Sequence, residues 1–249
     1  MRIDILTLFP EMFAGPFDTS ILKRARENKL LDINLINIRD FSQNKHHTVD
    51  DTPFGGGAGM VMQAEPIFKA MEYLEQQQGD LGRVVMMCPQ GQPFSQELAK
   101  DLATARRLVL LCGHYEGIDE RVREKLVTDE ISIGDYVLTG GELPAMVVVD
   151  AVARMIPGVL GEMASAEEDS FYSGLLEHPH YTKPRNYQGM EVPEILLSGH
   201  HKNIEKWRRR QSLMRTLERR PELLDNVELT KEDKKVLQEV YDKLKKLLK

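Results

Sequence analysis

The chain has 249 residues, of which 41% are hydrophobic and 29% charged, the balance of a globular protein with one or two domains and a real core. Its two cysteines, Cys88 and Cys112, lie in apolar strand-like runs, which argues against a disulfide-built secreted domain. No apolar run approaches a membrane span, and Asp4 and Pro10 are unlike a signal-peptide core, so we expect a cytoplasmic protein with no membrane partner.

The net charge of -6 is unevenly distributed along the chain. Residues 200–249 carry 15 Lys and Arg against 9 Asp and Glu, a net of +6, whereas residues 1–199 carry 18 against 30, a net of -12. An acidic body followed by a basic tail predicts two functions in two segments.

The first part of the chain alternates apolar runs with helix-like stretches. Strands are predicted at Arg2–Phe9, Leu31–Ile38, Arg83–Cys88 and Arg107–Cys112, and helices at Ser20–Asn28, Ser95–Ala105 and Pro144–Met155. The third and fourth strands are almost wholly apolar, as are strands buried on both faces of a parallel sheet. Residues 1–160 are therefore expected to form an α/β domain.

The second part of the chain changes character. Residues 161–173 are small, acidic and aperiodic, which is typical of a linker or mobile loop, and residues 174–249 predict a small helical domain. Its first helix, Ile204–Arg220, is expected to place Ile204, Trp207, Met214 and Leu217 on one apolar arc. Thr230 and Asp233 form a capping-box signature for a last helix, whose expected apolar face is Val236, Val240, Leu244 and Leu247.

Glycine-rich stretches interrupt the first part at Pro53–Met60, Pro89–Gly91, Cys112–Asp119 and Ile133–Pro144. Three of them follow apolar strands, and the carboxyl ends of parallel strands are where open α/β sheets bind ligands. The sequence therefore predicts a ligand site at that edge. It contains neither a complete GxGxxG nor a GxxxxGK[ST] motif, so a phosphate-cradling nucleotide site is not supported, whereas an adenosyl ligand without phosphates is permitted.

Two groups of charged residues have alternative interpretations. Arg154 ends an almost wholly apolar helix, and its spacing favours an i, i+4 pair with Asp150 over a role in stabilising an anion at the site. Glu167, Glu168 and Asp169 form either a solvated loop or, if one is buried beside a substrate, a base whose pKa is raised by its neighbours.

Histidine doublets and an arginine strip complete the candidate residues. The doublets lack the spacing of transition-metal sites, so a surface or RNA-facing role is favoured; they are His46 with His47, His178 with His180, and His200 with His201. On the helix from Ile204, the residues Arg208, Ser212, Arg215 and Arg219 recur at i, i+4, i+7 and i+11, a row suited to a phosphate backbone.

Long motifs in the chain closely resemble one protein family. They are TVDDTPFGGGAGMVM (48–62), GHYEGIDERV (113–122), IGDYVLTGGELPAM (133–146), ASAEEDSF (164–171), HPHYTKP (178–184) and LLSGHH (196–201). The family is that of the bacterial tRNA (guanine-N1)-methyltransferases, which act on the guanine 3′ of the anticodon at tRNA position 37. The resemblance runs from the first strand to the C-terminal helices.

The resemblance implies an α/β fold of the SPOUT class, with a parallel sheet, a deep trefoil knot around an S-adenosylmethionine site and a small helical C-terminal domain. It implies three parts, which are residues 1–160 for the cofactor, 161–173 as a flexible linker and 174–249 for tRNA binding. It also implies a homodimer with a shared active site, a tRNA anticodon stem-loop as substrate, and a dependence on Mg²⁺.

The residues implied by the resemblance fall into three sets. The catalytic pair is Asp169, as general base, and Arg154, as its electrostatic helper. The cofactor set is Pro89, Gly91, Gly113, Glu116, Ile133, Gly134, Asp135, Tyr136, Val137, Leu138, Gly140, Gly141 and Pro144, with Glu116 also a candidate metal participant. The tRNA set is Asp50, Gly55, Gly56, Gly57, Ser165 and His180, to which the strip adds Arg208, Arg215 and Arg219.

Two alternatives compete with this interpretation. One is a related knotted enzyme that methylates a ribose 2′-hydroxyl of RNA. The other is a non-catalytic nucleic-acid-binding protein that uses the arginine strip alone.

Overall fold

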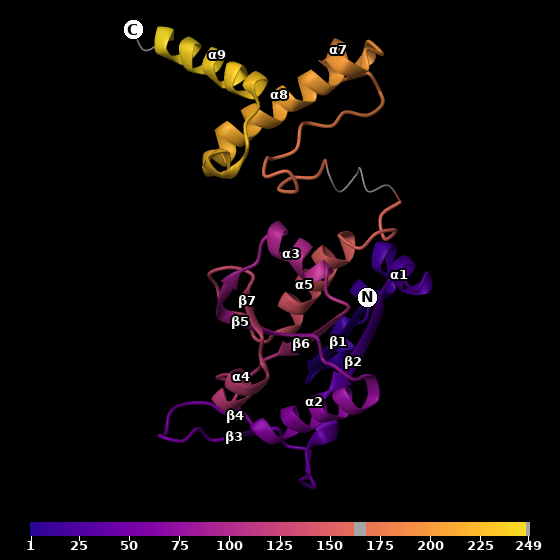
Figure 1. The fold of residues 1–249 in the computed structure, drawn as a ribbon, viewed down its shortest axis with the longest axis vertical. Coiled ribbons are helices and arrows are strands. Elements are labelled where there is room, and N and C mark those ends of the chain that lie inside the picture. The colour runs from indigo at the N-terminus through magenta and orange to yellow at the C-terminus, as the bar shows by residue number, and fades with distance from the viewer. Residues whose placement is uncertain (162–167, 248–249) are drawn as a thin grey trace. The chain divides into compact units, whose positions relative to one another are not determined.

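The computed structural model describes residues 1–161 and 168–247, and the chain divides into two compact units. We call Met1–Met163 the N-terminal unit and Ala164–Lys249 the C-terminal unit (Figure 1). Of the predicted linker 161–173, residues 162–167 lie outside the described residues.

A five-stranded sheet forms the centre of the N-terminal unit. Its strands are β1 (Arg2–Thr7), β2 (Asp32–Asn37), β5 (Arg83–Pro93), β6 (Arg107–Cys112) and β7 (Asp129–Ser132). They lie in the order β2-β1-β6-β5-β7 and every neighbouring pair is parallel. The parallel α/β architecture expected from the sequence is confirmed.

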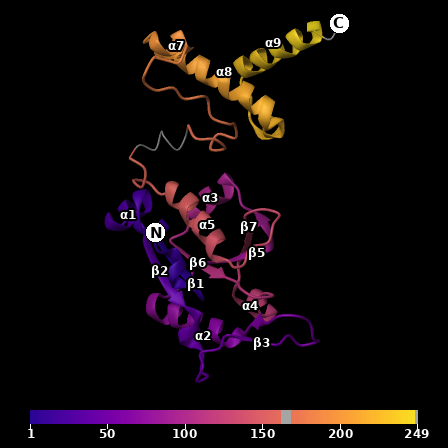
Figure 2. The ribbon, with the colours of Figure 1, turned by 180° about the vertical axis from the view of Figure 1, so that it is seen from behind.

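Helices cover both faces of this sheet (Figures 1 and 2). They are α1 (Ser20–Glu27), α2 (Ala64–Gln78), α3 (Gln96–Ala103), α4 (Glu120–Leu126) and α5 (Glu142–Arg154). Alternate residues of β6 point to opposite faces, so Leu108 and Leu110 pack with α1, α3 and α5, while Val109 and Leu111 pack with α2 and α4. Both faces of the strand are therefore buried, as its apolar run predicts.

Short elements connect these strands and helices. They are the 3-10 turns η1 (Pro10–Phe13), η2 (Pro16–Asp18) and η3 (Ile38–Phe41), and the two-residue antiparallel strands β3 (Asp50–Asp51) and β4 (Val61–Met62). Sequence signals place several boundaries correctly. Ser95 caps α3, because its hydroxyl accepts a hydrogen bond from the Leu98 N–H at 3.2 Å.

Other elements differ from the prediction. The strand predicted to end at Cys88 continues to Pro93, with an irregular register against β7 between Met87 and Gln92. The helices α2 and α4 and the strand β7 were not predicted from the sequence. The strand β7 is only four residues long and begins with Asp129 and Glu130, so its apolar signal is weak.

A buried charge cluster lies at the amino edge of the sheet. Asp4 on β1 is fully buried and accepts a hydrogen bond from the Arg107 Nε of β6 at 2.8 Å, and Arg2 and Asn34 also donate to it. Burial alone raises the pKa of Asp4, but these donors outweigh it and lower that pKa below its ordinary value. The cluster ties three neighbouring strands together at the edge opposite the glycine-rich loops.

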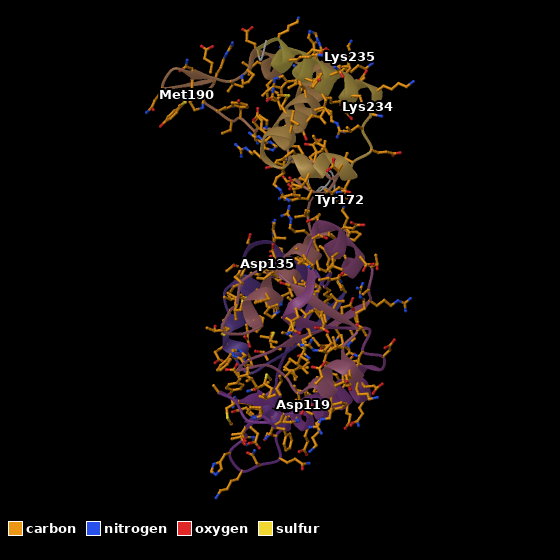
Figure 3. The ribbon with its side chains drawn as sticks, turned by 90° about the vertical axis from the view of Figure 1, so that its left-hand side faces the viewer. Asp119, Asp135, Tyr172, Met190, Lys234 and Lys235 are labelled. Carbon is orange, nitrogen blue, oxygen red and sulfur yellow. The ribbon has the colours of Figure 1, made fainter. Side chains whose placement is uncertain are left out.

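The C-terminal unit is helical. Its helices are α7 (Glu194–Leu197), α8 (His201–Arg219) and α9 (Lys231–Leu247), with the 3-10 turn η4 (Pro221–Asn226) and a hairpin of β8 (Asn186–Tyr187) and β9 (Met190–Glu191). The hairpin residue Met190 and the α9 residues Lys234 and Lys235 are exposed on this unit (Figure 3).

Helix packing in the C-terminal unit only partly follows the predicted apolar arc. Leu213 and Thr216 are the fully buried residues of α8, whereas the arc residues, such as Trp207 and Met214, are half-buried. The predicted arc is partly buried, but the most buried residues lie beside it, and Thr216 is a polar residue that a hydropathy pattern does not select, although its hydroxyl accepts from the Leu176 N–H.

The predicted capping box at the start of α9 is confirmed. The Thr230 Oγ1 accepts from the Asp233 N–H at 3.1 Å, and the Asp233 carboxylate accepts from the Thr230 N–H at 2.9 Å. Asp233 also accepts from Arg209 of α8 at 2.8 Å, and mainly this guanidinium lowers the pKa of Asp233 to about 2. Among the described residues, no helix combines the length and apolar character that crossing a bilayer requires.

Candidate functional site

A cavity of the N-terminal unit lies at the carboxyl ends of β5, β6 and β7. It has a volume of about 290 Å³ and is walled by three segments, residues 86–90, 113–118 and 131–141 without Asp135, together with Arg123 and Pro144. Its position is the one that open α/β sheets use for ligands. The glycine-rich loops identified from the sequence therefore meet around one cavity.

Close backbone contacts hold the three segments together. A Cβ atom on Gly91 would lie 2.4 Å from the carbonyl carbon of Glu130, and one on Gly141 would lie 2.7 Å from the Cα of Cys112. The Gly141 N–H also donates to the Gly113 carbonyl at 2.9 Å. Glycine is required at positions 91 and 141 because one stretch of main chain passes directly over another there.

The loop 133–141 has its own internal support. The Ser132 hydroxyl lies 3.1 Å from the Gly134 carbonyl and 3.2 Å from the Gly134 N–H, and Tyr136 N–H donates to the same carbonyl at 2.9 Å. Gly134 has a φ of +149°, and a Cβ there would meet the Tyr136 ring at 2.5 Å. The loop is therefore specified by glycine conformation and by short polar contacts.

A second glycine-rich loop is fastened to the cavity wall. Met62 N–H donates to the Gly117 carbonyl at 2.9 Å, and Glu116 N–H donates to the Met60 carbonyl at 3.0 Å. A Cβ on Gly59 would lie 2.4 Å from the Glu116 Oε1. The loop that ends at Met60 and the cavity residue Glu116 are therefore parts of one packed arrangement.

Few charged side chains line the cavity. They are Glu116 and Arg123, and the Arg123 guanidinium contacts Glu130 at 3.2 Å and Gln90 at 3.0 Å. In the described part of the chain, no lysine is among the lining residues. A triphosphate would need clustered positive charge, so the cavity suits a ligand held by backbone groups and apolar walls.

Most of the predicted cofactor residues line this cavity. They are Pro89, Gly113, Glu116, Ile133, Gly134, Tyr136, Val137, Leu138, Gly140, Gly141 and Pro144. Gly91 packs against β7 behind the cavity wall. Asp135, labelled in Figure 3, is exposed. The structure thus brings the predicted set together with two exceptions.

The predicted tRNA residues of the N-terminal unit lie in β3 and in the hairpin loop between β3 and β4. Asp50 pairs through its backbone with Met62, and Gly55, Gly56 and Gly57 are exposed with positive φ angles. Phe54 at the same loop is fully exposed. The loop presents main chain and one aromatic ring to solvent.

A buried polar chain that the sequence analysis missed adjoins the cavity. The Thr7 hydroxyl donates to the Glu142 Oε1 at 2.6 Å, and the His114 Nε2 lies 2.7 Å from the Glu142 Oε2. Glu142 is fully buried, and its charge adds to the main effect of burial in raising the pKa of the Cys112 thiol. Thr7 and Glu142 are 135 residues apart, so no local motif signals their contact.

Arg154 lies in the last turn of α5 and is half-buried, whereas Asp150 one turn before it is exposed. Most of α5 is buried as predicted, but Leu143 and Val147 are 50% and 46% exposed. These two residues recur at i and i+4 on the side of the helix that leads to Asp150 and Arg154. The helix therefore presents an apolar strip that ends in a guanidinium.

Asp169 belongs to the C-terminal unit and is half-buried in a turn, where its backbone carbonyl accepts from the Tyr172 N–H at 3.3 Å. The chain that follows is fixed to α8. Leu176 N–H donates to the Thr216 hydroxyl at 2.9 Å, and the Ser212 hydroxyl donates to the Leu176 carbonyl. Ser165 and Glu167 lie outside the described residues.

The arginine strip on α8 makes contacts within its own unit. Arg208 lies 3.7 Å from the Glu168 carboxylate, and Arg215 donates to the Glu177 carbonyl at 3.5 Å, while Arg219 is exposed. The Ser212 hydroxyl of the strip donates to the Leu176 carbonyl. Contact of the arginines with nucleic acid stays a prediction.

The histidines next to this strip are close to each other. The rings of His178 and His180 lie 4.5 Å apart, and His178 is buried while His180 is exposed. Burial is the main cause that lowers the pKa of His178. The described residues contain no group of three or more His, Cys, Asp and Glu side chains that could hold a metal ion.

Comparisons with known proteins match this arrangement to one group. The family model described as tRNA (Guanine-1)-methyltransferase TrmD matches residues 1–226. A protein of Desulforamulus reducens named tRNA (guanine-N(1)-)-methyltransferase is 78% identical over 245 residues, which cover 98% of this chain and 96% of that protein. Proteins of the same name from Pelotomaculum thermopropionicum and Bacillus cereus are 68% and 58% identical, covering 99% and 96% of this chain and 99% and 98% of their own lengths.

Proposed function

The chain belongs to the tRNA (guanine-1)-methyltransferase family, and from this premise we propose how its residues carry out methylation of guanine N1 in tRNA. It is an S-adenosylmethionine-dependent tRNA (guanine-N1)-methyltransferase. We assign the target guanine to tRNA position 37, next to the anticodon. We place the reaction in the cytoplasm.

The observation that carries this proposal is the cavity at the carboxyl ends of β5, β6 and β7. S-adenosylmethionine has no phosphates, and its adenosine and methionine parts need an apolar slot with backbone donors and acceptors. The cavity has apolar walls, main-chain loops fixed by glycines and no lysine among its described lining residues. When bound, the cofactor supplies a methyl group activated by a sulfonium.

Asp169 is proposed as the general base. Guanine N1 carries a proton at neutral pH, so that proton must leave before the nitrogen can attack the methyl group. A carboxylate is a weak base for this task, so it needs assistance from elsewhere in the site. Its half-buried position in the turn at the start of the C-terminal unit is compatible with such a role.

Arg154 is proposed to provide that assistance. Loss of the N1 proton shifts negative charge onto guanine O6, and a guanidinium close to O6 stabilises that charge. The Arg154 position at the C-terminal end of α5 suits a cation, because the helix dipole favours positive charge there.

The geometry of α5 supports a homodimer with a shared active site. Pro144 lines the cavity, and Arg154 lies ten residues further along the same helix, which corresponds to roughly 15 Å at 1.5 Å per residue. Arg154 is therefore far from the cavity of its own chain. If two α5 helices pack antiparallel through Leu143 and Val147, Arg154 of one copy approaches the cavity end of the other.

A trefoil knot in the N-terminal unit is a further part of the proposal. The strand β7 pairs with β5, and the segment after it returns to Cys112 and Gly113 at the end of β6. This tight return of residues 133–141 is the local geometry expected of a knot that encloses the cofactor site. We also propose that the helical C-terminal unit binds the anticodon stem.

A dependence on Mg²⁺, which the family resemblance implies, stays a prediction: Mg²⁺ binds through one or two carboxylates and keeps several waters, and Glu116 is its candidate ligand in this chain. The described residues offer no cluster of three or more metal-ligating side chains, and Glu116 alone provides one carboxylate. We therefore route no step of the reaction through a metal ion.

The decisive experiment compares two tRNA transcripts that differ only in guanine or adenine at position 37. We expect methyl transfer from S-adenosylmethionine to the guanine transcript alone, with N1-methylguanosine in the digested product. Equal activity on both transcripts overturns the assignment to position 37.

Product analysis also separates the two competing functions. A ribose 2′-O-methyl nucleoside in the digest would replace the proposed activity with ribose methylation. Binding of tRNA without uptake of S-adenosylmethionine in a calorimetric titration would support a non-catalytic nucleic-acid-binding protein.

A further inference from the structure

The buried chain of Thr7, Glu142 and His114 has no part in the mechanism above, although His114 lines the cavity. The three residues come from the end of β1, the first turn of α5 and the loop after β6. They join three segments at the wall of the cavity where the cofactor is proposed to bind.

The direction of each hydrogen bond in this chain can be derived. The Thr7 Oγ1 accepts from the Phe9 N–H at 2.9 Å, so its own hydrogen is directed to the Glu142 Oε1 at 2.6 Å. Glu142 stands in the first turn of α5, where the helix dipole favours a negative charge. An ionised carboxylate only accepts hydrogen bonds, so the His114 Nε2, 2.7 Å from Oε2, carries a hydrogen and donates it.

The ring of His114 is also fixed by its surroundings. The Phe9 ring packs edge-on against it with the centroids 4.9 Å apart, and the His114 N–H donates to the Met62 Sδ at 3.2 Å. A Cβ on Gly140 would lie 2.3 Å from the His114 Nε2 and 2.5 Å from the Glu142 Oε2. The cavity loop thus passes directly over the hydrogen bond between His114 and Glu142, and only glycine allows this.

We propose that Glu142 is a positioning residue that holds His114 with its hydrogen on Nε2, so that Nδ1 is a hydrogen-bond acceptor on the cavity wall for a donor group of S-adenosylmethionine. The cofactor offers such donors in its ribose hydroxyls and amino groups. This inference rests on the proposed function for the identity of the ligand. The tautomer itself rests only on the contacts of Thr7, Glu142 and His114.

The substitution Glu142→Gln tests the tautomer with almost no change in shape. The amide oxygen of glutamine still accepts from Thr7, but its NH₂ group donates to the His114 Nε2, which moves the ring hydrogen to Nδ1. Nitrogen-15 NMR of histidine-labelled protein at pH 8 should show Nε2–H for His114 in the unaltered chain and Nδ1–H in the variant. A ring already protonated at Nδ1 in the unaltered chain overturns the inference.

Two substitutions of His114 test the acceptor. Asparagine places its amide oxygen near the position of Nδ1, whereas glutamine places its amide group near Nε2 and keeps the contact with Glu142. In titrations with S-adenosylmethionine we expect His114→Gln and Glu142→Gln to weaken binding by about tenfold, the effect of one lost hydrogen bond. His114→Asn should stay within about threefold of the unaltered chain.

Thr7→Val serves as the matched control. It removes the hydrogen bond from Thr7 to Glu142 but leaves the hydrogen bond between His114 Nε2–H and Glu142 in place. We expect its affinity for S-adenosylmethionine to stay within about twofold, whatever it costs in thermal stability. Equal affinity losses in all the variants would show that the hydrogen bonds of Thr7, Glu142 and His114 only support the fold, and would overturn the role of Nδ1 as an acceptor. If the unaltered chain does not bind S-adenosylmethionine, the proposed function fails instead, and the NMR result still decides the tautomer.

Discussion

The two units of the molecule build their surfaces by different means. In the N-terminal unit, the cavity is shaped by main chain that passes over main chain at Gly91 and Gly141, and by polar groups that are buried behind its wall. In the C-terminal unit, long charged side chains such as Arg209 and Arg210 make the contacts between helices. The comparison shows that fixed main chain shapes the pocket, whereas paired charged side chains connect the helices of the C-terminal unit.

The largest difference between the two units is expected when the proposed base, Asp169, is removed from the C-terminal unit. We expect Asp169→Ala to lower the rate of methyl transfer by about 10²–10⁴-fold, the usual contribution of a general base. Binding of S-adenosylmethionine, measured by calorimetry, should stay unchanged because the cavity belongs to the N-terminal unit. Normal turnover by this variant would remove Asp169 from the mechanism.

The next largest effect should come from a side chain added to the cavity loop. In Gly140→Ala, the new Cβ meets His114 and Glu142 within 2.5 Å, so the loop must shift. Moving a packed loop costs about 1–3 kcal/mol, and we expect S-adenosylmethionine affinity to fall about 10–100-fold. The control is Gly161→Ala, where a Cβ meets nothing within 4 Å. Similar affinities of the two variants would contradict a cavity shaped by glycine.

A smaller effect is expected for the ion pair between α8 and α9. The Arg209 guanidinium holds the pKa of Asp233 at about 2, below its ordinary value of 3.8. The pair therefore stabilises the C-terminal unit above about pH 4, and this contribution is lost as the pH falls towards 2. We expect Asp233→Asn to reduce the free energy of unfolding by about 1–2 kcal/mol at pH 7.

Chemical denaturation at pH 7 and pH 2.5 measures this effect. The difference between the unaltered chain and Asp233→Asn should shrink at the lower pH. Glu239→Gln, which removes the exposed partner of Arg210, is the control and should change stability by less than about 0.5 kcal/mol. A difference that is the same at both pH values would exclude the ion pair as its source.

The smallest effect should come from a single exposed arginine. We expect Arg219→Gln to weaken tRNA binding about threefold at physiological salt and to reduce the salt dependence of binding by about one phosphate contact. Binding measured at several salt concentrations reports both quantities. An unchanged salt dependence would show that the strip at Arg219 does not contact the phosphate backbone.

Local signals in the sequence were sufficient for much of the fold. The apolar run Arg107–Cys112 is a strand buried on both faces, and Thr230 with Asp233 opens α9 as its spacing predicts. Such features depend on neighbours within a few residues. Most of the cofactor residues predicted from the family motifs line one cavity, with Gly91 and Asp135 as the exceptions.

Long-range contacts were beyond the reach of the sequence. Glu142 lies just before the predicted helix start at Pro144 and carries no apolar signal, yet it is fully buried, and Thr7 and His114 supply its hydrogen bonds from distant segments. Thr216 in α8 is polar and fully buried for a similar reason. Hydrophobic periodicity is calculated from apolar residues. It therefore does not identify a buried polar residue whose hydrogen-bond partners lie in distant segments.

The strand order has a consequence for how this chain folds as it is synthesised. β1 pairs with β2 on one side, but its other neighbour is β6, so Ile3 lies beside Leu108. At about 5–20 residues per second, the ribosome needs roughly 4–14 s to extend the chain from the end of β2 at Asn37 to the start of β6 at Arg107. During that interval one edge of β1 has no partner strand. The apolar surface of the segment that contains β1, α1 and β2 stays accessible to chaperones and to other nascent chains.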